Sequence, residues 1–169
     1  ALGANSVAAV GHAQTNSGAY VGYLATISLD TSAMKVVPLS PFEGHNVVWG
    51  PDDTIWVLGG QFGEGRRLLA APPHATLRHY DKNGGVIGEH LPWPAIQCGR
   101  HPLSPGRAAL AASSDRIGVH LPACNTWIEL SPKGEQLGRW QAGLPSNYNA
   151  EKAILRAPVM TADNRVYCQ

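Results

Sequence analysis

Two kinds of short hairpin alternate along this chain, and each kind recurs at intervals of about 50 residues. The first kind is an apolar stretch, a tight polar turn and a second apolar stretch. It occupies residues 46–57, 108–119 and 157–168. The second kind has a turn opened by Asp30, Asp81 or Ser131, which lie 51 and 50 residues apart (81 − 30 and 131 − 81). Two interleaved hairpins per interval give four strands per repeat, the content of one β-propeller blade.

The turns and strands have the composition that hairpins require. Asp and Ser side chains accept hydrogen bonds from backbone groups that follow them in type I turns, and Gly84 and Gly134 supply the positive φ angle. The stretches between turns are short and rich in β-branched and aromatic residues, as at 54–58. Only residues 149–156 are predicted to be helical.

The repeats therefore predict an all-β fold, a β-propeller with about three four-stranded antiparallel blades. We place the repeat units at approximately 5–52, 53–114 and 115–163, with a fourth beginning at 164–169. A β-sandwich is the alternative, and turn signals alone would fit it. Two series of hairpins with matching offsets favour the propeller.

Two stretches resemble the repeats of NHL-type and related six-bladed propellers. They are residues 52–57, Asp-Asp-Thr-Ile-Trp-Val, and residues 79–88, His-Tyr-Asp-Lys-Asn-Gly-Gly-Val-Ile-Gly. In that family a D-G-x-I-x-V strand precedes an x-x-F/Y-D-x-x-G hairpin, and Asp53 stands here in place of the usual Gly. The resemblance covers nearly the whole chain and implies a six-bladed ring, without implying an active site. The remaining blades are then expected in the same longer chain or in a partner chain.

Long connections predict where a ligand would bind. The connections at about 12–22, 60–75, 92–106 and 141–154 are the long ones, and in antiparallel blades they emerge on one face, which we name the loop face. The alternative is that they are loop extensions without function. The candidate ligand-binding residues of the loop face are His12, Tyr20, Gln61, Glu64, Arg66, Arg67, His74, Trp93, Arg100, His101, Asn147 and Tyr148.

Motifs for metal binding and hydrolysis are missing from the sequence. The seven histidines include no H-E-x-x-H or H-x-H spacing, so no metal site is predicted. No serine lies in a G-x-S-x-G elbow, and His101 and Ser104 lie in a Pro-rich loop without an orienting acid. We therefore predict no catalytic residue.

Cys98 and Cys124 are predicted to lie close enough for a disulfide, because they fall in loops on the same face of neighbouring blades. Such a bond requires an oxidising compartment. The alternative is three buried thiols, and the pairing of Cys168 is left open.

Composition restricts the classes of partner and the cellular location that we expect for this protein. Lys plus Arg number 13 against 12 Asp plus Glu, and no basic stripe exists, so a nucleic-acid partner is not expected. No apolar run approaches the roughly 18 residues of a membrane span. Charged residues are only 15% of the chain, Lys is sparse, and the chain starts at Ala1 without Met. These features favour an exported protein, secreted or periplasmic.

The sequence favours a non-enzymatic propeller module that binds a protein, peptide or glycan through its loop face, without a cofactor. The alternative is a propeller enzyme, similar to lactonases or streptogramin lyases, with calcium or another divalent ion in the central channel. Such a site needs Glu, Asp, Asn or His converging on the channel. The strands predicted to lie nearest the axis carry few carboxylates, which favours binding over catalysis.

Overall fold

A computed structural model of the chain describes residues 1–63, 74–92, 96, 108–122, 125–141, 158–161, 163 and 165–167. These residues form antiparallel sheets with very little helix, including the short 3₁₀ turn η1 (Pro51–Asp53), so the predicted all-β class is confirmed. No helix within these ranges has the length and apolar character needed to span a membrane. The helix predicted at 149–156 lies outside the described residues.

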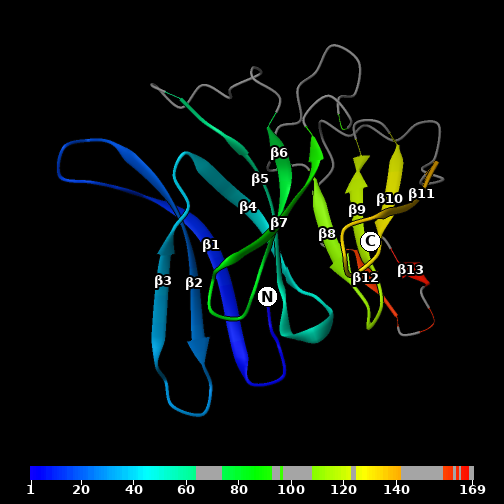
Figure 1. Ribbon diagram of the computed structural model, residues 1–169, viewed down its shortest axis with the longest axis horizontal. Coiled ribbons are helices and arrows are strands. Elements are labelled where there is room, and N and C mark those ends of the chain that lie inside the picture. Colours follow the sequence, from blue (N-terminus) through cyan, green and yellow to red (C-terminus); the bar gives the residue numbers. More distant parts are fainter. Residues whose placement is uncertain are drawn as a thin grey trace.

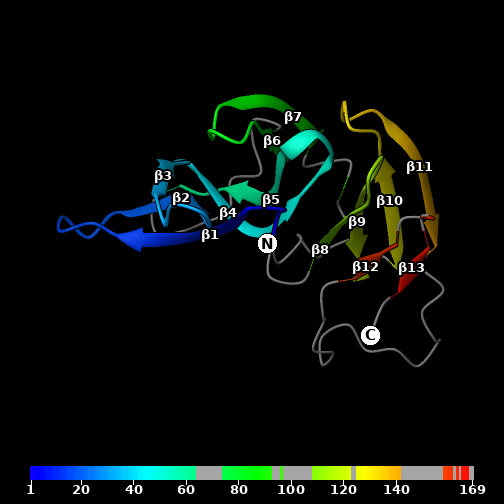
Figure 2. The same cartoon turned by 90° about the horizontal axis from the view of Figure 1, so that it is seen from below.

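The strands form four sheets that follow one another in chain order (Figures 1 and 2). The first sheet contains β1 (Ser6–Gln14), β2 (Tyr20–Ser28) and β3 (Met34–Pro38). The second contains β4 (Phe42–Trp49), β5 (Ile55–Gln61), β6 (Ala75–Tyr80) and β7 (Val86–Pro92). The third contains β8 (Ala109–Ala112), β9 (Ile117–Leu121), β10 (Thr126–Leu130) and β11 (Gln136–Gln141). The last is the hairpin of β12 (Val159–Met160) and β13 (Val166–Tyr167).

Both predicted series of hairpins are confirmed. The first series corresponds to the pairs β4–β5, β8–β9 and β12–β13, and the second to β2–β3, β6–β7 and β10–β11. In the β6–β7 turn, Oδ1 of Asp81 accepts hydrogen bonds from the backbone N–H groups of Asn83 and Gly85, at 2.7 and 2.9 Å. Gly84 has φ of 81° and Gly134 has φ of 84°. Local turn chemistry therefore determines these hairpins.

The grouping of strands into sheets differs from the predicted units. The second and third repeat units were expected to begin near residues 53 and 115, whereas the four-stranded sheets begin one strand earlier, with β4 and β8. The tight turn after β4 joins it to β5 from Trp49↔Ile55 to Phe42↔Gln61, which holds both strands in one sheet. The first strands, β4, β8 and β12, also pack against one another in succession.

Consecutive sheets pack face to face through three apolar clusters, which we name joints. The first joint, between the first and second sheets, consists of Ala8, Leu24, Leu39, Phe42, Ile55, Val57 and Tyr80. The second joint, between the second and third sheets, includes Trp56, Leu58, Leu77, Leu110, Ile117, Val119, Leu121 and Ile128. The third joint, between the third sheet and the β12–β13 hairpin, consists of Ala111, Trp127, Met160 and the half-buried Val166.

Candidate functional site

Four of the twelve predicted ligand-binding residues lie in the described part of the chain. His12 lies near the end of β1, Tyr20 begins β2, Gln61 ends β5, and His74 directly precedes β6. The other eight, and the three cysteines, lie outside the described residues, so the disulfide remains a prediction. These undescribed residues are Glu64, Arg66, Arg67, Trp93, Cys98, Arg100, His101, Cys124, Asn147, Tyr148 and Cys168.

The structure brings two of these four residues into contact. The rings of His12 and Tyr20 meet edge to face, with centroids 5.8 Å apart, and both side chains are exposed. His74 is only 5% exposed, so a ligand on the loop face would reach little of it. Gln61 is half-buried. Tyr20 is therefore the predicted residue around which the described site is built.

A cavity of about 520 Å³ opens beside Tyr20. The β1–β2 connection, the β3–β4 connection and the chain after β5 meet here, and the β1–β2 connection is visible at the upper left of Figure 1. The volume is within the range of small-ligand and side-chain pockets. The lining residues are Ser17, Gly18, Ala19, Tyr20, Gly22, Ser40, Pro41, Glu43, Phe62 and Gly63.

Two glycines bring the strands below this cavity close together. A methyl group on Gly22 would lie 3.1 Å from Cα of Glu43 and would overlap the carbonyl oxygen of Phe42. A methyl group on Gly59 would overlap the carbonyl oxygen of Glu43. Only glycine lets the β2 and β5 backbones approach β4 this closely. As a result the Glu43 side chain is 4% exposed, although it lines the cavity.

Glu43 is the residue that the sequence analysis missed. It stands between Phe42 and Gly44 as the one acidic residue of β4, and that placement is the only sequence signal of its role. With Glu43, the described part of the lining contains one carboxyl group, the aromatic residues Tyr20 and Phe62, and hydroxyl groups. A carboxylate beside aromatic rings is suited to recognising a cationic or strongly polar group.

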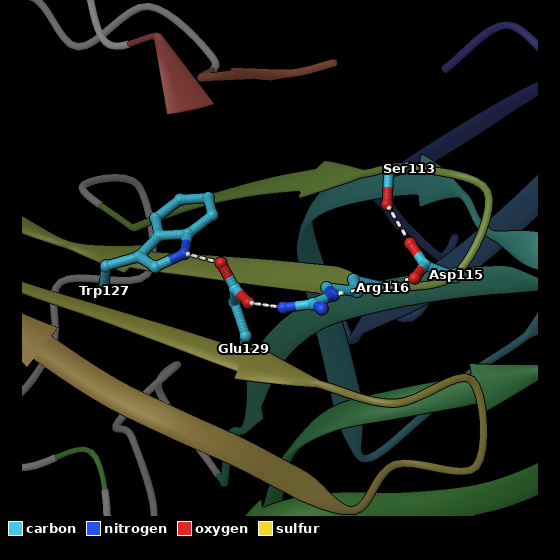
Figure 3. Close-up of polar contacts among 5 residues, drawn as sticks. All are labelled: Ser113, Asp115, Arg116, Trp127 and Glu129. Carbon is cyan, nitrogen blue, oxygen red and sulfur yellow. Dashed lines mark hydrogen bonds and ion pairs between the residues drawn. The ribbon is translucent and has the colours of Figure 1, made fainter. Parts of the chain in front are cut away.

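A second polar constellation lies on the third sheet (Figure 3). Nη1 of Arg116 donates to Oε2 of Glu129 at 2.8 Å, and Nε1 of Trp127 donates to Oε1 of the same carboxylate at 3.0 Å. Oγ of Ser113 donates to Oδ1 of Asp115, whose Oδ2 lies 3.7 Å from Nε of Arg116. Hydrogen bonding to Glu129 raises the pKa of Arg116. Both oxygens of Glu129 already have partners, so this network connects the β8–β9 turn to β10.

The same turn device recurs in the last hairpin. Oγ1 of Thr161 donates to Oδ1 of Asp163, and Oδ2 of Asp163 lies 3.0 Å from Nε of Arg165. The equivalent residues in the third sheet are Ser113, Asp115 and Arg116 in the β8–β9 turn. Since a hydroxyl, an aspartate and an arginine recur at the same place in two turns, we assign them to turn structure and not to a ligand site.

Among the described residues, no three His, Cys, Asp or Glu side chains lie close enough together to hold one metal ion. Compared with known proteins, the chain matches no model of a protein family and no curated protein. The cavity beside Tyr20 is the described feature with the size and the polar lining of a ligand site.

Proposed function

We propose that this chain is a binding module built on an NHL-type β-propeller. Hairpins at intervals of about 50 residues, antiparallel sheets in chain order, and an apolar joint between each pair of consecutive sheets support the proposal. A six-bladed ring would obtain its remaining blades from the same longer chain or from a partner chain. No catalytic step is part of this function.

The observation that carries the binding role is the cavity beside Tyr20. It lies at the ends of β2, β4 and β5, where the long connections of the loop face begin. The described lining has a single ionisable carboxylate, that of Glu43, together with Tyr20 and Phe62. Since a carboxyl group beside aromatic rings is suited to a cationic group, a cation is the ligand chemistry that we propose.

We propose a protein or peptide ligand that inserts a Lys or Arg side chain into this cavity. Both side chains carry an apolar stem that packs against aromatic rings and a charged end that a carboxylate can bind. A cavity of about 520 Å³ accommodates one such side chain with part of its backbone. A glycan, which would use the hydroxyl groups of Ser17 and Ser40, is the competing outcome of the test.

The test begins with an array of peptides in which each Lys or Arg peptide has a partner with Gln at the same position. Hits are then titrated calorimetrically against wild type, Tyr20→Ala and Glu43→Gln. Removing an aromatic contact at the centre of an interface commonly weakens binding by about 2 kcal/mol, so we expect Tyr20→Ala to raise Kd more than roughly tenfold. Glu43→Gln removes the charge and keeps the shape, and it should remove the preference for Lys over Gln.

Tyr167→Ala is the matched control, because Tyr167 is 53% exposed against 43% for Tyr20 and lies in the last hairpin. It should leave Kd unchanged. Binding of glycans and not of peptides, or equal Kd values for wild type and both cavity variants, would contradict the proposal.

The exported location also remains our proposal. It depends on the low charge content of the chain and on the disulfide predicted between Cys98 and Cys124. Thiol counting on protein denatured without reductant tests it: one free thiol supports the bond, and three would remove this argument for export.

A further inference from the structure

Two histidines and a tryptophan form an aromatic stack in the second joint. The rings of Trp56 and His79 are stacked with centroids 4.0 Å apart and an interplanar angle of 16°. The His90 ring lies 5.2 Å from Trp56 at 26° and 6.1 Å from His79. Trp56 is fully buried and His79 is 5% exposed. The stack therefore belongs to the interior of the contact between the second and third sheets.

Strand register places these rings together. Trp56 on β5 pairs with His79 on β6, and His79 pairs with Gly88 on β7. Gly88 has no side chain, and His90 fills the space: a methyl group on Gly88 would lie 2.8 Å from Nε2 of His90. The His90 ring also contacts the β10–β11 turn, where a methyl group on Gly134 would overlap its Cε1 and Nδ1. His90 thus connects the second sheet to the third.

Neither imidazole has a hydrogen-bond partner for its Nε2 atom among the described residues, although both atoms are buried. Burial lowers the pKa of His79, and a charge on His90 lowers it further. Burial also lowers the pKa of His90, while Glu89 opposes this effect. Both rings are therefore favoured in the neutral form in the folded state.

The described charges around the stack do not favour a cation there. On β6 and β7, Arg78 and Glu89 pair with each other at 2.9 Å, and Arg78 lies over Phe42 in the first joint. In the β10–β11 turn, Lys133 and Glu135 flank Gly134 and are exposed. Tyr80 lies beside His79 on β6, and burial raises the pKa of its hydroxyl, which stays neutral. On β5 the stack meets Trp56, whose ring face would attract a charged imidazole and so partly opposes the effect of burial.

We propose that the His79–His90 pair makes the second joint a pH-sensitive contact, closed while both imidazoles are neutral and loosened when acid charges them. A charged imidazole adds a second N–H donor, which here would be buried without an acceptor. Two charged rings with centroids 6.1 Å apart would also repel each other within an apolar cluster. The third sheet is thereby released from the second at acidic pH.

The direction of the pH dependence follows from linkage. A histidine whose folded-state pKa lies below its unfolded value of about 6.5 binds fewer protons in the folded state. Its contribution is fully present above about pH 6.5 and is lost as the pH falls through the folded-state pKa. The stability of the second joint therefore decreases on acidification below the unfolded value.

Urea unfolding from about pH 7.5 to about pH 5.5 tests this proposal in wild type and His79→Phe/His90→Phe, a double variant that keeps the aromatic packing and cannot be protonated. We expect the urea midpoint of wild type to decrease as the pH falls, and the midpoint of the double variant to decrease by about half as much or less. His12→Phe is the control at an exposed ring, and it should lose as much as wild type. An equal loss in the double variant and in wild type overturns the proposal.

His120 requires its own control, because it is 2% exposed near Trp127 in the third joint and burial lowers its pKa too. His120→Phe should therefore reduce the response too, but by less than the double variant does. Wild-type imidazole NMR titrations decide the matter even if the double variant fails to fold. Titration of both His79 and His90 below about pH 6.5 supports the proposal, and titration of either ring above that value overturns it.

Discussion

Gly118→Ala is expected to destabilise the protein more than the small size of the added methyl group suggests. Gly118 lies on β9 opposite Glu129, and the Trp127 ring lies directly over it. A methyl group here would overlap Cζ2 and Cη2 of Trp127 and would lie 2.8 Å from Cε of Met160. The indole cannot simply move away, because its Nε1 donates to the buried carboxylate of Glu129.

The magnitude follows from these two contacts. Overpacking a close-packed core costs about 1–3 kcal/mol. Weakening the 3.0 Å bond from Trp127 to Glu129 adds about 1 kcal/mol, since bonds to charged groups are among the stronger ones. The expected total is therefore about 2–4 kcal/mol, and at roughly 2–4 °C per kcal/mol for a chain of this size Tm should fall by roughly 5–15 °C.

A double-mutant cycle measured by urea unfolding separates this clash from a general effect of the added methyl group. Trp127→Phe shortens the ring over Gly118, so Gly118→Ala should cost less than about 1 kcal/mol in that background. If Gly118→Ala costs the same with Trp and with Phe, to within about 0.5 kcal/mol, the reasoning is refuted.

Two further predictions concern the second sheet. Oγ1 of Thr76 donates a buried hydrogen bond to the backbone carbonyl of Leu91 at 2.6 Å. Thr76→Val should therefore lower the free energy of unfolding by about 0.5–1.5 kcal/mol. An unchanged urea midpoint would contradict this. Cζ of Arg78 lies 4.3 Å from the Phe42 ring centroid, and Arg78→Lys keeps the charge without the planar stack. That variant should lose about 0.5–1 kcal/mol in urea unfolding, and Phe42→Leu should remove the difference between Arg and Lys.

The hairpins could be predicted from the sequence because their causes are local. Asp81 accepts bonds from the residues that follow it, and Gly84 adopts the positive φ angle, so residues 81–85 contain the whole signal. The assignment of strands to sheets could not be predicted in the same way. A repeat in the sequence gives the number of residues between equivalent strands, but it does not show which strand of each repeat begins a sheet. The ladder between β4 and β5 decides which strand begins the sheet.

The candidate site shows the same contrast. Tyr20 could be predicted, because it borders a long connection between two strands. Glu43 could not, since its burial depends on Gly22 in β2 and Gly59 in β5, which approach it only in the folded chain. The stack of His79 and His90 likewise depends on register, because a histidine spacing shows neither the strand pairing nor the place left open by Gly88.

The three joints also determine how cooperatively the protein unfolds, because each joint couples one sheet to the next. Each joint connects only two consecutive sheets, so their stabilities combine along the chain as in a linear array of repeats. Trp56 lies in the second joint and Trp127 in the third, and each indole reports on its own interface. A lesion in one joint is therefore expected to divide the melting transition at that point, so that Trp56 and Trp127 report two different temperatures.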